Sequence, residues 1–270
     1  MDDVRSGFSD GPDARIYIQE WGEGPALVCL HGLGGGGHFF APLGAELGSH
    51  THVIAPDLPG CGHSASASGF SFDECAGAVV ALAHRRRWSR ACLLGHSMGT
   101  IVALEAIRRE PSLAAGLIAV GGLPEPPDDA RARFAARIQR VERGGLAGLA
   151  DEVIAANFSE RTRRERPELT GLFGRAFELQ APDRYVDATR ALARWTARPL
   201  PPMEGVACLV ATGTEDRYAS PEAVRRFAQA LPDTARVEIL DDCGHLPFLE
   251  RPAAFARLVE GFLQQLRARG

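Results

Sequence analysis

The sequence contains no lysine, and all 30 basic residues are arginine. Schiff-base and pyridoxal phosphate catalysis depend on a lysine amine, and the phosphate-binding loop of P-loop nucleotide enzymes carries a lysine after its glycines. The absence of lysine therefore excludes these three classes of protein, even though 24% of the residues are charged and the formal net charge is -4.

The cysteines show no metal-binding or redox spacing. Six are present, and Cys29, Cys92 and Cys208 lie inside apolar runs, where a thiol behaves as a small hydrophobic side chain. No pair has the C-x-x-C spacing of zinc and redox sites. We therefore expect no bound metal.

Long apolar runs and an excess of positive charge are also missing. No run approaches the roughly 18 apolar residues of a membrane helix, and the net charge of -4 offers no basic surface to nucleic acid. Residues 1–5 include two aspartates and are not followed by the apolar segment of a secretory signal. We expect a cytoplasmic protein that binds neither membranes nor nucleic acid; the sequence carries no signal for its oligomeric state.

Strand-like runs alternate with helical patterns over most of the chain. The expected strands are residues 15–20, 26–30, 52–56, 90–94, 117–120, 207–211 and 236–240. Most of these runs are continuously apolar, which is typical of strands buried on both faces. This alternation, in 270 residues with 45% hydrophobic content, predicts one α/β domain whose mostly parallel sheet is covered by helices on both faces.

The pattern changes between Pro124 and Pro202, where strand-like runs give way to helical spacing. Clusters of prolines mark both ends of this segment, as they often mark a domain boundary. We predict that residues 123–202 form a helical lid, or cap, inserted into a core domain made of residues 1–122 and 203–270.

Residues 95–99 read Gly-His-Ser-Met-Gly, which is a G-x-S-x-G pattern. A sharp turn from a strand into a helix strains the middle residue and lifts its side chain clear, and glycines fit the crowded positions two before and two after it. A strand-like run precedes this motif and a helical pattern follows it. We therefore predict that Ser97 is a nucleophile.

A serine hydroxyl needs a base to take its proton and a third group to orient that base. His245 follows the last expected strand, and Asp216 follows the strand before it. Asp241 and Asp242 compete for the role of the acid, but they lie too close in sequence to His245 to approach its ring from the far side. Glu125 is a further candidate; we predict Asp216.

Together these motifs resemble the α/β-hydrolase family. The resemblance rests on His-Gly at 31–32, Asp-Leu-Pro-Gly-Cys-Gly-His-Ser at 57–64, the serine motif at 95–99, Asp216 and Gly-His at 244–245. It implies the α/β-hydrolase fold, with a helical lid inserted after the sixth strand. It also implies an oxyanion hole formed by the backbone amides of Leu33 and Met98.

Within the family, the predicted lid is similar to that of 3-oxoadipate enol-lactonases and their esterase relatives. The similarity lies in Arg137, in Gly-Leu-Ala-Gly-Leu-Ala at 145–150 and in Gln-Ala-Pro-Asp-Arg-Tyr at 180–185. Two departures leave the substrate open. Asn-Phe at 157–158 stands where such lactonases have a Trp-Phe pair, and Thr100 stands where a third glycine is common.

The resemblance implies a serine acyl hydrolase that cleaves an ester or lactone through an acyl-enzyme, without a cofactor. The expected substrate-binding residues are His31, Gly32, His96, Arg137 and Trp195. A carboxylate on the substrate is expected because residues 128–198 contain 14 arginines against 11 acidic residues, an excess of 14 - 11 = 3 positive charges. Arg133 and Arg137, on the first helix of the predicted lid, are our candidates to face the cleft and bind it; the alternative is that these arginines form a solvated helix surface.

Two other functions stay open. Carbon-carbon bond hydrolases of the same fold keep the serine, although their motif tends toward Gly-Asn-Ser, whereas this chain has His96 before Ser97. A non-catalytic ligand-binding protein could also retain the hydrolase pocket. Dehalogenases and epoxide hydrolases of this fold use an aspartate nucleophile, and Ser97 excludes them.

Overall fold

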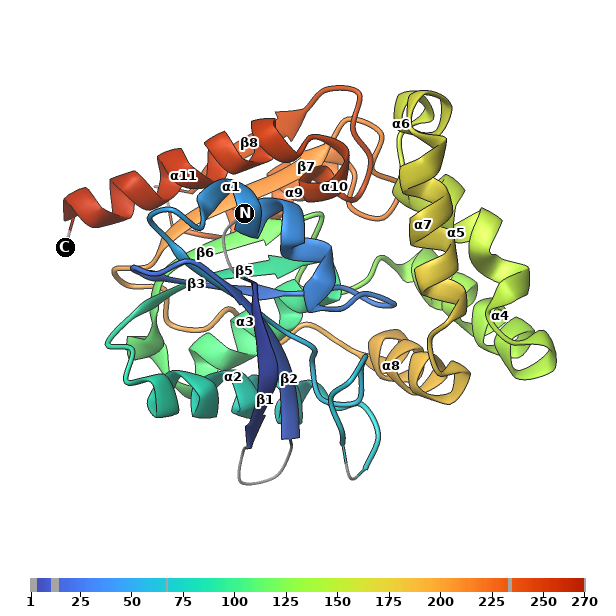
Figure 1. Ribbon diagram of the computed structural model, residues 1–270, viewed down its shortest axis with the longest axis horizontal. Helices are drawn as coiled ribbons and strands as arrows, with labels where there is room; N and C mark the ends of the chain where they lie inside the picture. Colours follow the sequence, from blue (N-terminus) through green and yellow to red (C-terminus); the bar gives the residue numbers. More distant parts are fainter. Residues whose placement is uncertain (1–3, 11–14, 67, 233–234, 270) are drawn as a thin grey trace.

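The computed structural model describes residues 4–10, 15–66, 68–232 and 235–269 (Figure 1). Within these ranges the chain forms one eight-stranded sheet, in the order β1-β2-β4-β3-β5-β6-β7-β8. The strands are β1 (Arg5–Asp10), β2 (Arg15–Trp21), β3 (Ala26–Leu30), β4 (His52–Pro56), β5 (Ala91–His96), β6 (Ala114–Val120), β7 (Ala207–Gly213) and β8 (Arg236–Leu240). β1 and β2 are antiparallel to their neighbours, and the pairs from β4 to β8 are parallel.

The predicted α/β domain with a mostly parallel sheet is confirmed, with one strand more than the sequence indicated. β1 has the sequence Arg-Ser-Gly-Phe-Ser-Asp, which has neither an apolar run nor the alternation of a half-buried strand. Its position is set by pairing with β2, where Phe8 lies opposite Tyr17 and the two rings are 5.3 Å apart. A cross-strand contact of this kind cannot be read from a local pattern.

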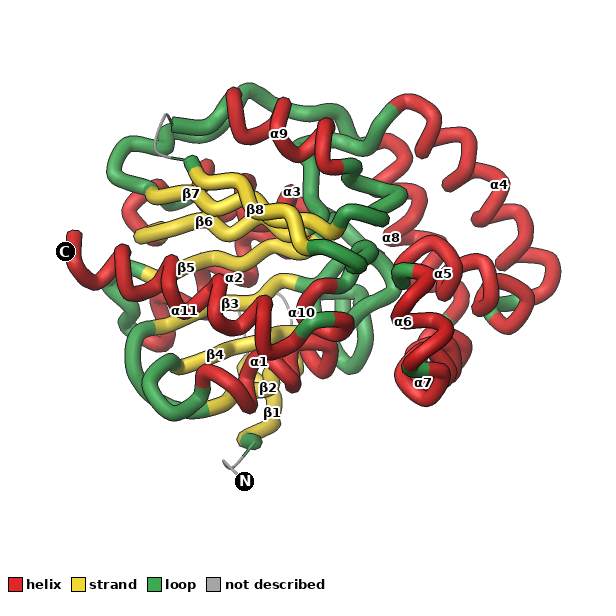
Figure 2. The backbone as a smooth tube through the Cα atoms, turned by 90° about the horizontal axis from the view of Figure 1, so that it is seen from above, coloured by secondary structure: helices red, strands yellow, loops and turns green. Residues whose placement is uncertain are grey.

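Helices cover both faces of the sheet (Figure 2). One face packs against α2 (Phe72–Arg86), α3 (Met98–Arg109) and α9 (Pro221–Gln229). The other packs against α1 (Ala41–Leu47) and α11 (Pro252–Arg269), which follows the short α10 (Pro247–Glu250). Short 3₁₀ helices lie at Gly37–Phe40, Pro111–Leu113 and Ala147–Leu149. Because helices shield both faces, strands such as β3 and β5 are buried along their whole length.

Five α-helices lie between β6 and β7 in the described part of the chain, and we call them the inserted helices. They are α4 (Asp128–Gly144), α5 (Ala150–Asn157), α6 (Glu160–Glu165), α7 (Pro167–Glu178) and α8 (Pro182–Arg194). They stand beyond the end of the sheet at which β5 and β6 finish (Figures 1 and 2). The sequence predicts a lid in this segment. That these helices act as a lid, and the predicted domain boundaries, stay predictions.

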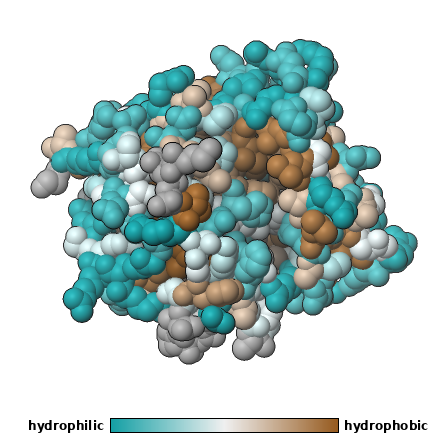
Figure 3. Space-filling view, viewed as in Figure 1, coloured by the Kyte–Doolittle hydropathy of each residue, from teal (hydrophilic) through white to brown (hydrophobic). Residues whose placement is uncertain are grey.

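The surface is mostly hydrophilic on the side seen in Figure 3, with apolar residues gathered near the inserted helices. Leu172 and Leu179, on α7 and directly after it, are 71% and 68% exposed. In the described ranges, no helix combines the length and the apolar character needed to cross a membrane. All six cysteines are free thiols, and burial raises the pKa of Cys208 to about 12.

The serine motif depends on close backbone contact between α3 and β3. A Cβ atom added at Gly99 would lie 2.1 Å from the carbonyl oxygen of Leu30, and one added at Gly95 would lie 2.6 Å from the Cα of Thr100. Real Cβ atoms do not approach other heavy atoms so closely. Glycine at both positions therefore lets the helix start directly against the sheet.

We predict that Gly99→Ala lowers the free energy of unfolding by about 2 kcal/mol or more, because the new methyl group overpacks a site closed by backbone. The matched control is Gly261→Ala, in α11, where an added Cβ meets nothing within 4 Å. Alanine should stabilise that helix by roughly 0.5–1 kcal/mol. Urea unfolding compares the two variants, and equal stability of Gly99→Ala and the wild type would contradict the close contact.

Candidate active site

Ser97 sits at the junction of β5 and α3 with a strained backbone. Its φ is 51° and its ψ is -120°, in a region that residues other than glycine rarely adopt. The Ser97 amide donates to the carbonyl of Val120 at 2.8 Å, and its carbonyl accepts from the Thr100 amide at 2.9 Å. These two bonds hold the turn and leave the half-buried side chain facing a pocket.

His245 and Asp216 form a buried pair after the last two strands. The distance between His245 Nδ1 and Asp216 Oδ2 is 2.8 Å. Oδ2 also accepts from the hydroxyl of Thr212 at 2.6 Å, while Oδ1 accepts from the amides of Tyr218 and Ala219 at 2.8 and 2.9 Å. Both carboxylate oxygens therefore have partners, and the side chain has little freedom to turn.

Asp216 is ionised at neutral pH. Burial acts to raise its pKa, but the charge and hydrogen bond of His245 and the bonds from Ala219 and Thr212 outweigh burial, and the pKa lies below its ordinary value of 3.8. An ionised carboxylate only accepts hydrogen bonds, so the proton of this contact is on His245 Nδ1. Nε2 of a neutral imidazole then has a free lone pair, as a general base requires.

The other acids proposed for the histidine lie elsewhere. The Asp242 carboxylate accepts from Arg161 at 2.9 Å, and Asp241 is exposed. Glu125 accepts from the Ala197 amide at 3.0 Å. The structure thus brings Asp216 to His245, as the order of residues along the chain suggested.

The two expected oxyanion donors flank the serine. Met98 is the first residue of α3, and the first amides of a helix have no acceptor within it. Leu33 lies in the loop that follows β3 and lines a pocket together with Gly32 and Ser97. Neither the Leu33 nor the Met98 amide donates a turn or loop hydrogen bond to another described residue. An oxyanion hole formed by these two amides stays a prediction.

His31 fixes this loop from behind rather than lining the pocket. Its ring is fully buried; Nε2 accepts from the Leu58 amide at 3.0 Å, and Nδ1 lies 2.9 Å from the carbonyl of Gly32. Burial lowers its pKa, although the charge of Asp57 acts in the opposite direction. A neutral ring that donates through Nδ1 satisfies both contacts.

His96, the last residue of β5, contacts the loop that carries His245, which we call the histidine loop. Its Nε2 donates to the carbonyl of His245 at 3.0 Å, and the two rings are 4.7 Å apart. Burial, and secondarily the nearby His245, place the pKa of His96 well below its ordinary value, so the ring is neutral. A Cβ at Gly32 would lie 2.9 Å from both His96 Nδ1 and Ser97 Cβ, which explains the glycine there.

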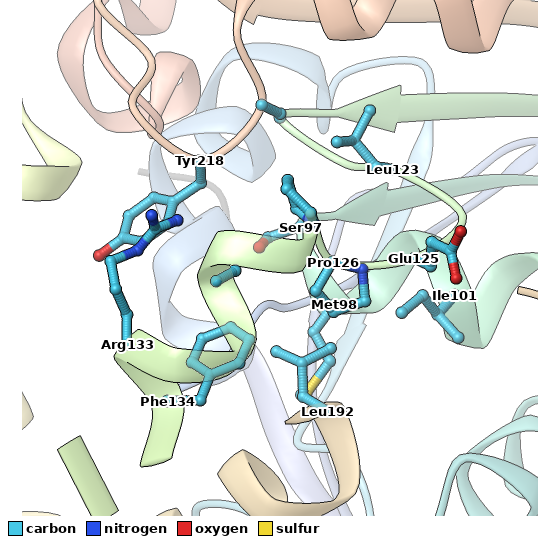
Figure 4. A pocket seen from close by; sticks show the side chains of 14 residues that line it. Ser97, Met98, Ile101, Leu123, Glu125, Pro126, Arg133, Phe134, Leu192 and Tyr218 are labelled. Carbon is cyan, nitrogen blue, oxygen red and sulfur yellow. The ribbon is translucent and has the colours of Figure 1, made fainter. Parts of the chain in front are cut away.

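Two pockets meet at the serine. The first, shown in Figure 4, is largely apolar; it is lined by Ser97, Met98, Ile101, Gly121, Leu123, Glu125, Pro126, Pro127, Ala130, Arg133, Phe134, Leu192, Tyr218 and Ala219. The second is lined by Gly32, Leu33, Gly34, Phe39, His96, Ser97, Phe134, Arg137, Val153, Asn157, Phe173, Phe177, Tyr185, Leu192, Tyr218, His245 and Leu246. The inserted helices supply much of both linings.

Arg137 brings positive charge to the second pocket. Only 8% of the residue is exposed, and its guanidinium lies 3.2 Å from Glu152 and 3.4 Å from the hydroxyls of Tyr185 and Tyr218. Glu152 also pairs with Arg140, so one carboxylate serves two guanidinium groups. The buried Nε of Arg137 has no hydrogen-bond partner among the residues that the structure describes. This cluster has a net positive charge and an unused donor.

Trp195 lines neither of the two pockets at Ser97. Its indole N–H donates to the carbonyl of Pro124 at 3.0 Å, and its ring packs 4.6 Å from that of Phe72. The expected contact between Trp195 and the substrate therefore lacks a structural basis, because the end of α8 turns this side chain toward α2.

Sequence reasoning missed Tyr218 and Thr212. Tyr218 lines both pockets, and its ring is 4.8 Å from that of His245. Thr212 holds the acid. Their nearness to Asp216 in sequence is a signal that could have found them. In the described ranges, no group of three or more His, Cys, Asp or Glu side chains is placed to hold a metal ion.

Comparisons with known proteins agree with this fold. A model of the alpha/beta hydrolase family matches residues 27–258. The pimeloyl-[acyl-carrier protein] methyl ester esterase of Methylococcus capsulatus is 29% identical over 268 residues, which cover 92% of this chain and 98% of that protein. Polyketide synthase ThaQ of Burkholderia thailandensis is also 29% identical over 268 residues, covering 94% of this chain, and the chain spans only 12% of that synthase.

Two solved structures share the fold over nearly the whole chain. The enol-lactonase from Burkholderia xenovorans LB400 has a TM-score of 0.87 and 25% identity, with 96% of this chain and 100% of that chain covered. The thermophilic esterase from Thermogutta terrifontis, in a malate-bound structure, has a TM-score of 0.84 and 23% identity, with 98% and 99% covered.

We predict that the stability contributed by Asp216 depends on pH. Its folded pKa is lowered, so the contribution is present above the ordinary value of 3.8 and is lost as the pH falls through the folded pKa. Urea unfolding at pH 7 and at about pH 3 should show that Asp216→Asn loses less stability relative to the wild type at the lower pH. Asp241→Asn, at an exposed position, is the control. An equal deficit for Asp216→Asn at both pH values would contradict the lowered pKa.

Proposed function

The chain belongs to the alpha/beta hydrolase family, and from this premise we propose that it is a serine acyl hydrolase cleaving an ester or lactone. The observation that carries the proposal is the 2.8 Å contact between His245 Nδ1 and Asp216. It leaves Nε2 as the basic nitrogen of a histidine that lines the same pocket as Ser97. The esterase and enol-lactonase among the similar proteins support this class of reaction.

The proposed reaction begins with attack of Ser97 Oγ on the substrate carbonyl. His245 Nε2 accepts the serine proton, and the ionised Asp216 stabilises the resulting imidazolium. The amides of Leu33 and Met98 bind the oxygen on which negative charge develops. His245 then returns the proton to the leaving alcohol, and a water molecule activated by the same histidine releases the acid from Ser97.

We further propose that the substrate is small and carries a carboxylate, bound in the second pocket near Arg137. The support is the shared Glu152, which leaves the Arg137–Arg140 pair with one positive charge in excess. A carboxylate compensates that charge, and a charge-assisted hydrogen bond to a sheltered guanidinium is worth about 1.5–3 kcal/mol. Arg133 lines the other pocket, and it already pairs with Asp129.

The main alternative function is that of a non-catalytic ligand-binding protein with the same pocket. Labelling with a fluorophosphonate distinguishes such a protein from the enzyme. Stoichiometric labelling of Ser97 together with steady ester turnover supports the enzyme. Labelling without turnover of any ester or lactone in a panel would support the binding protein.

We predict that Ser97→Ala removes essentially all ester hydrolysis. Asp216→Asn should fold but lose roughly 10⁴-fold in kcat, because an amide at this position favours the wrong tautomer of the histidine. Circular dichroism checks folding, and steady-state kinetics measure the loss. Asp242→Asn is the matched control and should keep its activity. Full activity of Asp216→Asn, or loss in Asp242→Asn, would refute the assignment of the acid.

A second prediction concerns the carboxylate. The wild type should prefer a lactone or ester with a free carboxylate over the same compound methylated at that carboxylate. Arg137→Gln should reduce this preference in kcat/KM about tenfold or more, as expected for the loss of one charged hydrogen bond. Arg133→Gln is the control and should leave the preference unchanged. Equal kcat/KM of the wild type for the free acid and its methyl ester would contradict carboxylate recognition and indicate a general esterase.

A further inference from the structure

A second buried carboxylate, Glu250, lies at the end of α10 and takes no part in the reaction proposed above. It is 2% exposed. Its Oε1 accepts from the amide of Gly244 at 2.7 Å, and its Oε2 accepts from the amide and the hydroxyl of Ser159 at 2.9 and 2.7 Å. Glu250 therefore joins the loop that carries His245 to the first turn of α6, where Ser159 is the N-cap.

The backbone of the inserted helices meets the histidine loop at the same place. The amide of His245 donates to the carbonyl of Asn157, the last residue of α5, at 2.8 Å. A Cβ atom at Gly244 would lie 2.5 Å from that carbonyl oxygen and 2.9 Å from the Ser159 amide. The loop is thus pressed against the α5–α6 junction, with no room for a side chain between them.

The amide and the carbonyl of His245 therefore both have hydrogen-bond partners. Asn157 holds its N–H from the inserted helices, and His96 holds its carbonyl from the sheet. Glu250 maintains the first of these contacts, because it binds residues on both sides of it. A small rotation of this backbone would move the imidazole away from Ser97.

We propose that Glu250 is a positioning residue, whose carboxylate locks the histidine loop to the α5–α6 junction and so places His245 for proton transfer. The inference rests on the proposed function of Ser97 and His245. Besides the Cys243 thiol at 3.8 Å, three N–H or O–H donors converge on the carboxylate, so a glutamine, with one oxygen and one N–H₂ group, must leave at least one buried N–H without an acceptor. Glu250→Gln therefore weakens the hydrogen bonding of this side chain to either Gly244 or Ser159, with almost no change in side-chain volume.

The test compares two esters of one acid, an alkyl ester and a p-nitrophenyl ester. An alkoxide leaves only when His245 delivers a proton, whereas nitrophenolate leaves without one, so a misplaced imidazole affects the alkyl ester more. For Glu250→Gln we expect kcat/KM, which reports the acylation step in which the two leaving groups differ, to fall about 100-fold on the alkyl ester and about tenfold on the aryl ester, within the range of general acid–base catalysis. If the substitution merely unfolded a fraction of the protein, the rates on both esters would fall by the same factor.

Ser159→Ala is the matched control. It removes the hydroxyl bond to Glu250 and the cap of α6 but keeps both backbone donors. We expect it to lower the melting temperature and to leave the alkyl-to-aryl ratio of kcat/KM unchanged. Glu250→Asp retains the charge on a shorter side chain and should give an intermediate ratio. It also keeps the inference testable where Glu250→Gln fails to fold.

Amide hydrogen exchange supplies a readout that needs no turnover. The amides of Gly244 and His245 should exchange faster in Glu250→Gln or Glu250→Asp than in Ser159→Ala. A wild-type ester ratio and wild-type exchange at these amides in the Glu250 variants would overturn the inference. Ester hydrolysis retained by Ser97→Ala would instead overturn the proposed function, and the exchange rates would still decide whether Glu250 holds the loop.

Discussion

The hydrogen bond from His245 to the buried, ionised Asp216 is the interaction on which the rest of the site depends. A carboxylate in such surroundings stays charged only because its oxygens accept four hydrogen bonds, from His245, Thr212, Tyr218 and Ala219. Its charge sets the histidine tautomer, and the tautomer sets which nitrogen is basic. The proposed chemistry at Ser97 follows from that assignment.

The geometry around this pair is built from both parts of the chain. The sheet supplies the strained turn at Ser97 and the brace from His96, while the inserted helices supply the carbonyl of Asn157. The inserted helices also provide Arg137. The residue proposed to bind the substrate and the residues proposed to place the histidine therefore belong to one connected structure. On this account, changes in the inserted helices affect rate as well as specificity.

The sheet and the candidate triad were accessible from sequence for one physical reason. Buried parallel strands are continuous apolar runs, and their carboxyl ends meet at one edge, so Ser97, Asp216 and His245 converge once the strands are placed. The expected strands 26–30, 52–56 and 236–240 coincide with β3, β4 and β8. β1 was missed because its pairing, rather than its own pattern, makes it a strand.

The contacts of the inserted helices were not accessible in this way. Helical spacing shows which residues face inward but not which neighbour they meet, and so Trp195 was expected in the pocket although it packs on Phe72. Glu250 has no local signal for its role, since its partner Ser159 lies 91 residues away in the sequence. Such contacts depend on how two distant segments dock.

The most direct test of the central claim is mass spectrometry of the protein quenched during turnover of an ester whose acyl group is released slowly. The account predicts an increase in mass equal to the acyl group, located on the peptide that contains Ser97, and its disappearance as substrate is exhausted. Steady turnover without any acylated protein, or an acyl group on a different residue, would contradict it.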